Sequence, residues 1–427
     1  MLWRKIIAAC VALPLLAGSV AAQEKKTLTV WMTDSRVSYK AWLEKYIAEF
    51  KKTRPGVEIN VVQMAPADAY VKWPAAVAAG NAPDITWMFV AFAPWLHDMP
   101  RGGFVPMNDV VEQLGADRFS ETTKAAWRLN GDYLCVPVSR QTSYLFWRKD
   151  KFKAAGLDAP RTWSDVIAAA KKLTTPETGQ FGIAMAGKPD FQIRQVWETI
   201  LYSNGGNLID RDGKVTVDSP ESVRATEIYR ELFASSPPGS MANAFIEINR
   251  IFGQGSAAMV VSLPVVLTQL LSGDSSLAGQ VGAVIPSDNG GDATMQNYRG
   301  WCVFKTSKHP ELAKEFIKLL FSTDAYADHL EAAQLASLPV YNDKVAVDRF
   351  FSTNKTAKAF PDALRYILDN GRGYYAGINL YGPNPKAGQL NNEGVIERAL
   401  NRYLAEKGNA AATVKTIHSE IERVMKK

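Results

Sequence analysis

The chain has 427 residues, and at about 150 residues per domain this length predicts two to three domains. Hydrophobic residues make up 47% and charged residues 22%, which is the balance of a folded globular protein and excludes disorder as the main state. The formal net charge is +6, but the longest runs of Lys and Arg are only pairs. We therefore expect no nucleic-acid partner, because such a partner requires a concentrated basic stripe.

The N-terminus has the pattern of a secretory signal peptide. Arg4 and Lys5 precede an apolar stretch at 6–16, and small side chains lead up to Ala22. The apolar stretch is too short and too interrupted for a membrane-spanning helix, and no later stretch is more apolar. We expect residues 1–22 to be removed, with a buried N-terminal helix as the alternative.

The next part of the chain alternates strands and helices. Strands are expected at 27–32, 57–64 and 84–89, with helices at 38–52 and 68–79 between them. This order predicts a mostly parallel sheet covered by helices.

A second set of elements predicts a second α/β lobe. Its strands are expected at 133–138, 144–147, 181–185, 257–261 and 281–285. Its helices are expected at 162–173, 191–202 and 220–234, the first opened by a capping box at Thr162.

The last third of the chain is mainly helical. A strand at 298–304 is followed by helices at 310–321, 323–334, 355–369, 392–406 and 409–426. The segment 371–388 is rich in Gly, Pro, Asn and Tyr, which favours a binding loop over a spacer.

The usual motifs of metal, cofactor and nucleophile chemistry are missing from the sequence. The four His residues are scattered, and there is no Cys-x-x-Cys, no complete dinucleotide fingerprint and no Gly-x-Ser-x-Gly. We therefore expect a protein that is not an enzyme and has no metal or cofactor. Pairs of carboxylates are abundant, so a secreted glycosidase stays a remote alternative.

Several motifs resemble, in chain order, those of the extracellular solute-binding proteins of ABC importers, in the carbohydrate-binding group that includes maltose-binding protein. They are Gly-Asn-Ala-Pro-Asp-Ile at 80–85, Tyr-Leu-Cys-Val-Pro-Val at 133–138, Leu-Phe-Trp-Arg-Lys-Asp at 145–150, the Ala-Gly-Leu helix entry at 155–163, Gly-Ser-Ala-Ala-Met at 255–259, Ser-Lys-His-Pro-Glu at 307–311 and Leu-Pro-Val at 338–340. The sequence departs from the pattern at Trp147-Arg148, where Tyr-Asn is usual, and at Ser262-Leu263-Pro264, where an aromatic residue is missing. The second departure leaves the identity of the solute open.

This resemblance implies an α/β, two-lobed periplasmic-binding-protein fold with a hinge and an interlobe cleft. Lobe one would hold 24–138 plus 302–336 and lobe two 139–298 plus 339–427, with crossings near 138–143, 298–301 and 336–340. The protein would be a periplasmic monomer that captures a carbohydrate and delivers it to a membrane permease. A sugar phosphate, a polyol or another solute is the alternative, since Arg140, Arg194 and Arg299 leave an anionic ligand open.

Candidate contacts follow from the chemistry of sugars, which offer flat C–H faces to aromatic rings and hydroxyls to polar side chains. The candidates are Trp31, Asp34, Ser35, Trp87, Arg140, Gln141, Tyr144, Gln195, Trp197, Ser262, Tyr298, Arg299, Trp301 and Tyr374. Structural roles are the alternatives: Asp34 and Ser35 could cap a helix, and Trp87 could lie in the core of a lobe. We expect Trp163 in the core.

The resemblance also places Cys135 and Cys302 on neighbouring hinge strands. A disulfide is the alternative there, while two small buried thiols are the favoured interpretation.

Overall fold

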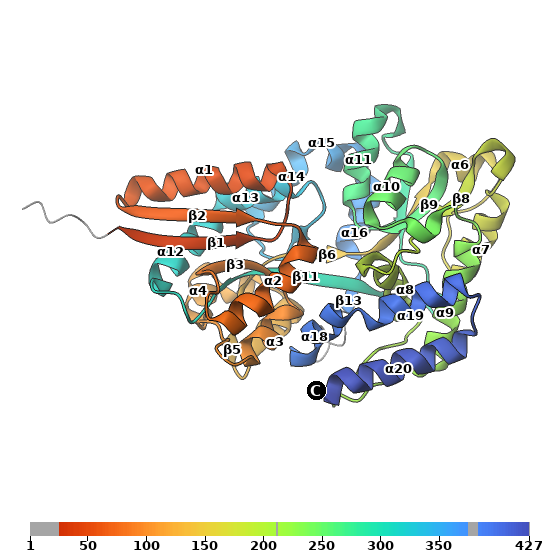
Figure 1. Cartoon of the computed structure of the whole chain (residues 1–427). Helices are drawn as coiled ribbons and strands as arrows, with labels where there is room; N and C mark the ends of the chain where they lie inside the picture. The colour runs from red at the N-terminus through yellow and green to blue at the C-terminus, as the bar shows by residue number, and fades with distance from the viewer. Residues whose placement is uncertain (1–24, 211, 375–382, 427) are drawn as a thin grey trace, which may run out of the picture.

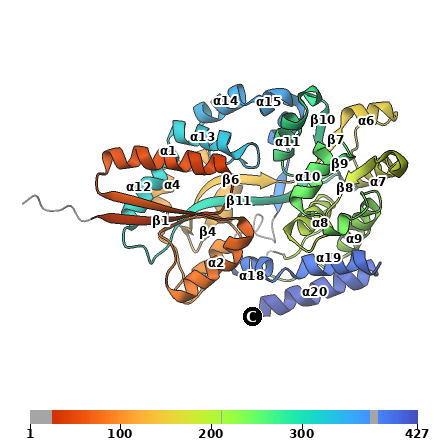
Figure 2. The ribbon, with the colours of Figure 1, turned by 45° about the horizontal axis from the view of Figure 1, so that its top comes forward.

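The computed structural model describes residues 25–210, 212–374 and 383–426, so the expected signal peptide lies outside the described residues. Two sheets form the centres of two lobes, which lie side by side (Figure 1). Long strands pass from one lobe toward the other, and Figure 2 shows them from a second direction.

The larger sheet belongs to lobe one and is mixed. Its strands, from edge to edge, are β12 (Leu338–Pro339), β6 (Val136–Thr142), β11 (Ala293–Val303), β3 (Ile85–Phe89), β1 (Lys26–Met32) and β2 (Val57–Gln63), with β13 (Arg372–Tyr374) also pairing with β11. β1 runs parallel to β2 and β3, whereas β11 runs antiparallel to β3 and β6. The predicted parallel β-α-β-α-β unit is therefore confirmed, and the two long strands β6 and β11 are added to its edge.

Helices cover both faces of this sheet. On one face α1 (Val37–Thr53) packs against α12 (Pro310–Leu320) and α13 (Thr323–Ala333). On the other face lie α2 (Pro66–Ala79) and α3 (Phe92–Asp98) (Figure 1). Further elements of this lobe are α4 (Asn108–Leu114), α5 (Glu121–Trp127), β4 (Arg128–Leu129) and β5 (Asp132–Tyr133).

The helix boundaries follow from the local sequence. α1 buries Tyr39, Trp42, Leu43, Tyr46 and Phe50, which recur at the three- and four-residue spacing of one helix face. α2 begins with a proline at its first position and ends at a glycine with a φ of 72°, a left-handed conformation that residues with a side chain rarely adopt.

The smaller sheet forms lobe two. Its strands are, in order, β10 (Val281–Val284), β7 (Tyr144–Arg148), β9 (Ala257–Ser262) and β8 (Phe181–Ala184). Its helices are α6 (Lys149–Ala154), α7 (Trp163–Lys172), α8 (Phe191–Ser203), α9 (Pro220–Phe233), α10 (Phe245–Gly253) and α11 (Val265–Gly273). The predicted capping box is confirmed: the Thr162 hydroxyl accepts a hydrogen bond from the Asp165 amide, and the Asp165 carboxylate accepts one from the Thr162 amide.

The last helices lead from lobe one to lobe two. They are α14 (Lys344–Thr353), α15 (Lys355–Ala359), α16 (Pro361–Asp369), α18 (Pro385–Glu393), α19 (Val395–Ala405) and α20 (Ala410–Lys426). α14 packs on α13 of lobe one, while α15 and α16 contact α11 and β10 of lobe two. Among the described residues, no helix is both long and apolar enough to cross a membrane.

The position of the third crossing differs from the expectation of 336–340. Arg349 on α14 reaches the carboxylates of Asp324, at 2.7 Å, and Asp328, at 3.1 Å, on α13. These ion pairs hold residues 344–353 against lobe one, so the chain leaves that lobe only after α14.

The favoured interpretation of Cys135 and Cys302 as free thiols is wrong, because the two residues form a disulfide. The antiparallel register of β6 and β11 pairs Val136 with Trp301, so the flanking cysteines face each other with their Cα atoms 4.3 Å apart. Both are fully buried. The disulfide therefore joins the two long strands at the end that lies in lobe one.

Candidate functional site

An ion-pair group lies where the chain leaves β1 beside β11. Asp34 accepts a hydrogen bond of 2.8 Å from Nε of Arg36, and its Oδ2 lies 3.2 Å from Nη1 of Arg299. The Arg299 guanidinium also lies over the rings of Trp87 and Phe89, 4.5 and 4.3 Å from their centroids. One buried carboxylate thus holds two guanidinium groups at this end of lobe one.

Burial and charge act in opposite directions on these groups. Burial raises the pKa of Asp34, but the hydrogen bond from Arg36 and the charge of Arg299 outweigh it, so the pKa lies below its ordinary value. Burial lowers the pKa of Arg299, and the Asp34 carboxylate opposes that effect. Asp34 is therefore ionised at neutral pH.

Lobe two contains a second buried ion-pair group, on α8 and α19. Nε of Arg194 donates to Oε1 of Glu198 at 2.7 Å, and Nη1 lies 3.8 Å from Oε1 of Glu397. Arg194 also donates to the side-chain oxygen of Asn391 on α18. Burial raises the pKa of Glu397 to about 7 and raises that of Glu198, although Arg194 opposes both shifts.

Tyr70 on α2 is affected by the charges of both groups. Burial raises the pKa of its phenol to about 12, and the charges that oppose this shift are Arg299 of lobe one and then Arg194 of lobe two. The ring stacks on Phe92 with centroids 4.6 Å apart and planes inclined by 20°. Tyr70 is therefore a lobe-one residue that also feels a charge of lobe two.

Four buried amide side chains near this junction have polar atoms without a hydrogen-bond partner in the described part of the chain. They are Gln192, Gln195, Asn249 and Asn297, which we call the interlobe amide cluster. In Asn297 both the oxygen and the nitrogen are unpartnered. An unsatisfied buried polar group costs about 1–3 kcal/mol, so four of them in one region make this region the candidate site for a polar ligand.

Three elements of lobe two bring most of this cluster together. The Ser262 hydroxyl at the end of β9 lies 2.7 Å from the side-chain oxygen of Asn249 on α10. Gln192 on α8 donates to the Val261 carbonyl at 3.3 Å, and Gln195 follows one helical turn later. Because α8 packs against β11, these groups approach Asn297 on that strand.

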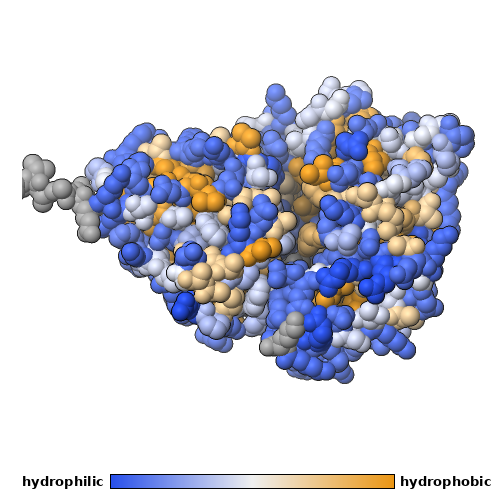
Figure 3. All heavy atoms as spheres, in the orientation of Figure 1, coloured by the Kyte–Doolittle hydropathy of each residue, from blue (hydrophilic) through white to orange (hydrophobic). Residues whose placement is uncertain are grey.

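The lobes touch at the rim of this region. The Thr268 hydroxyl on α11 donates to the Gln334 carbonyl at 3.0 Å. Leu263 and Val265 of lobe two form a small apolar cluster with Ala336. Figure 3 shows the surface hollowed between the two halves of the molecule. The structure therefore shows the lobes in contact around a recessed centre.

Five of the residues predicted from the sequence lie in this region. They are Asp34, Gln141, Gln195, Ser262 and Arg299. Gln141 on β6 pairs in register with Asn297 and donates to the Ala336 carbonyl at 3.1 Å. Their contact with a solute stays a prediction.

Trp87, Trp197 and Trp301, which the sequence predicts as solute contacts, each pack against other side chains inside one lobe. Trp87 and Trp301 stack on each other under α1 and α13, with centroids 5.8 Å apart. Trp197 faces α9 and donates its indole N–H to Thr226 at 3.0 Å. All three are core residues, as Trp163 is.

The remaining candidates lie elsewhere. The Tyr144 hydroxyl lies 2.9 Å from the carbonyl oxygens of Ile367 and Asn370, so this residue joins β7 to the end of α16. Ser35 is exposed and Trp31 is half-buried against the core of lobe one. Arg140 and Tyr298 face the opposite side of the hinge strands. Tyr374 lies on β13, and its side chain is outside the described residues.

Sequence reasoning missed Tyr70 and most of the amide cluster. Asn297 lies inside a strand that is buried along its whole length. An amide side chain is unusual in such a strand, and this polar residue among buried neighbours could have indicated a site. Gln192 and Asn249 lie on amphipathic helices. From the sequence alone, a polar residue on such a helix is assigned to the face that is exposed to solvent.

Comparisons with known proteins agree with this architecture. Residues 33–327 match the family model of the bacterial extracellular solute-binding proteins. A putative ABC transporter periplasmic-binding protein, YcjN of Escherichia coli K12, is 24% identical over 433 residues, which cover 98% of each chain.

Solved structures share the fold. The maltose-bound MalE3 protein of T. maritima superposes with a TM-score of 0.77 at 22% identity, covering 93% of this chain and 99% of that one. A solute-binding protein of Agrobacterium radiobacter K84 in complex with ribitol gives a TM-score of 0.76 at 24% identity, covering 94% and 99%. At these identities the likeness shows the two-lobed fold alone.

Proposed function

Because the chain belongs to the bacterial extracellular solute-binding proteins, we propose that it captures a carbohydrate or polyol between its lobes and delivers it to the permease of an ABC importer. It does so in the periplasm, as a monomer, after loss of residues 1–22. The observation that carries this proposal is the interlobe amide cluster, whose unpartnered carbonyl and N–H groups match the paired donor and acceptor character of hydroxyls.

The charges around the cluster favour an uncharged solute over a sugar phosphate. Three arginines face three carboxylates: Arg299 and Arg36 share Asp34, while Arg194 lies between Glu198 and Glu397. A phosphate would compete with these existing pairs for its arginine contacts. The maltose and ribitol named for the two similar structures are likewise uncharged.

The pairing of these carboxylates with arginines also favours a protein that binds a sugar without hydrolysing it. Glycoside hydrolysis uses one carboxylic acid and one carboxylate on either side of the scissile bond. Here Asp34 is held by two arginines, and Glu198 and Glu397 both lie on the same Arg194. We therefore expect no release of product from chromogenic glycosides.

A thermal-shift screen tests the proposal. Sugars, polyols and sugar phosphates are added to the mature protein, and hits are titrated by calorimetry. A solute that binds the native state at 100 times its Kd stabilises the protein by about 2.7 kcal/mol, which raises the melting temperature. The proposal fails if no neutral sugar or polyol shifts the melting temperature. If sugar phosphates are the only compounds that shift it, the preference for an uncharged solute is wrong.

A further inference from the structure

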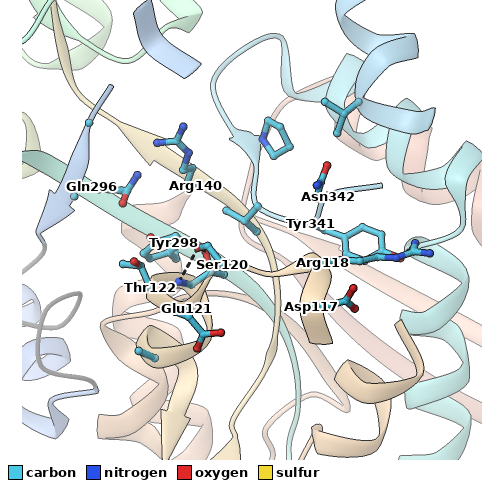
Figure 4. A pocket seen from close by; sticks show the side chains of 17 residues that line it. Asp117, Arg118, Ser120, Glu121, Thr122, Arg140, Gln296, Tyr298, Tyr341 and Asn342 are labelled. Carbon is cyan, nitrogen blue, oxygen red and sulfur yellow. Dashed lines mark hydrogen bonds between the residues drawn. The ribbon is translucent and has the colours of Figure 1, made fainter. Parts of the chain in front are cut away.

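A second cavity lies on the opposite face of the hinge strands. Along β11, Asn297 and Arg299 point toward the interlobe region, so the alternating residues Gln296 and Tyr298 point the other way. There they line a cavity of about 800 Å³ together with Arg140 of β6 (Figure 4). The sheet itself therefore separates this cavity from the interlobe amide cluster.

The walls of the cavity differ in chemistry. The side nearest the hinge carries Arg140, Gln296 and Tyr298, with hydroxyls from the start of α5 below them (Figure 4). The adjoining wall is apolar and consists of Pro339, Val340 and Val347. This combination suits a small molecule with one polar end and an apolar body.

The two arginines of the cavity differ in the contacts that their guanidinium groups make. Arg118, at the far end in Figure 4, donates to the Tyr341 hydroxyl at 2.8 Å, and its guanidinium lies 5.5 Å from the centroid of that ring. Arg140 has no carboxylate within ion-pair distance among the described residues, and it donates a hydrogen bond to the Thr142 hydroxyl at 3.4 Å. Arg140 is therefore the cation available to a ligand.

The carboxylates at the cavity do not neutralise Arg140. Glu121 pairs with Lys124 at 2.6 Å and is mostly exposed. Asp117 lies at the far end, beside Arg118 (Figure 4). The end of the cavity next to Arg140 instead contains the phenol of Tyr298 and the hydroxyl of Thr122. Both can donate a hydrogen bond to a carboxylate, which is also the group that a guanidinium binds.

We propose that this cavity binds a small organic carboxylate, with the carboxylate on Arg140 and Tyr298 and the apolar body against Pro339, Val340 and Val347. The site is separate from the interlobe region, so both can be filled together. β6 and β11 form its floor and are also the strands that lead into lobe two.

Calorimetry with benzoate as the probe tests this site, at constant ionic strength and with inorganic phosphate as the comparison anion. We expect benzoate to bind the mature wild-type protein, and phosphate to bind at least tenfold more weakly because it has no apolar body. Arg140→Gln should weaken benzoate binding by about tenfold to a hundredfold, as expected for the loss of a charged hydrogen-bond partner. Arg402→Gln is the matched control, since it removes an exposed arginine on α19 and should leave benzoate binding unchanged.

A second variant keeps the test independent of the folding of Arg140→Gln. Val340→Asp places a negative charge on the apolar wall and should also abolish benzoate binding, while the melting temperature of the free protein reports on folding. The proposal is overturned if benzoate does not bind the wild type, if it binds Arg140→Gln as well as the wild type, or if phosphate binds as tightly as benzoate.

Discussion

The buried amides explain how solute and closure depend on each other at the scale of single residues. Asn297 is 1% exposed, and neither of its polar atoms has a hydrogen-bond partner within the described part of the chain. Leaving such groups unsatisfied costs about 1–3 kcal/mol each, so the arrangement with the lobes in contact is disfavoured without a ligand. A solute that satisfies these groups removes the cost, which is how binding energy can drive closure.

Asn297→Ala tests this assignment. We expect the Kd for the solute to rise by about tenfold, since one or two hydrogen bonds are lost. The melting temperature of the free protein should stay the same or rise, because an unsatisfied buried amide is removed.

Trp163→Ala is the control for this variant. Its indole donates to Ser203 at 2.8 Å inside lobe two, so the substitution should cost about 3–5 kcal/mol of stability and leave the Kd unchanged. A large loss of stability in Asn297→Ala with unchanged affinity would contradict its role in solute binding.

Glu397 predicts a pH dependence of stability. Burial raises its pKa in the folded protein to about 7, above the unfolded value of 4.5, so the folded state binds more protons between these values. Its contribution to stability is therefore lost as the pH rises from 4.5 to 7, by about 3 kcal/mol at most. His329, whose pKa burial lowers to about 3, acts in the opposite direction below pH 6.5.

The comparison with Glu397→Gln isolates this group. Melting temperatures of wild type and variant are measured from pH 5 to 8, and the stability of the wild type relative to the variant should decline toward pH 7. A difference that does not change with pH would show that Glu397 does not titrate in this range.

The sequence could not decide which strand residues face the site. Trp87 was expected near the solute because it follows the Asp84 motif toward the end of a strand. However, β3 reads Ile-Thr-Trp-Met-Phe and is buried at every position, so no alternation reveals which face is which. Asp34 and Ser262 do lie in the interlobe region, and their contact with a solute stays a prediction.

At the scale of elements, capped or strongly periodic helices were predictable. α7 and α12 were expected within one residue of their bounds, since a capping box and an N-terminal proline fix their starts. The region between β3 and β5 was not predicted, because α3, α4 and α5 have only seven residues each. Two turns carry too little hydrophobic periodicity to be recognised.

The disulfide between the hinge strands predicts a large loss of stability on its removal. It closes a span of 167 residues, and a cross-link of that length stabilises a protein by about 5 kcal/mol through the entropy of the unfolded chain. The double variant Cys135→Ala/Cys302→Ala should therefore unfold at a much lower denaturant concentration. Solute affinity should change little, since the cysteines lie at the lobe-one end of the strands. Equal unfolding midpoints would contradict the prediction.

At the scale of the whole molecule, the contacts between lobes predict a change of shape. Thr268 to Gln334 and the Leu263–Ala336 contact join surfaces that would face water in an open form. We expect the radius of gyration from solution scattering to fall when the solute is added, as lobe two rotates about β6 and β11. An unchanged radius at saturation would show that the lobes are closed without solute.

The same disulfide has a consequence for the covalent topology of the chain. Cys135 and Cys302 turn the span between them into a ring, and all four strands of the lobe-two sheet lie within that ring, whereas α16 and the helices after it lie outside. A protease that nicks an exposed loop of the ring, such as 274–279, opens it without releasing a fragment. The nicked protein should migrate as one band on a non-reducing gel and as two under reduction. Cleavage at the Asn354 junction, outside the ring, should release its C-terminal piece under either condition.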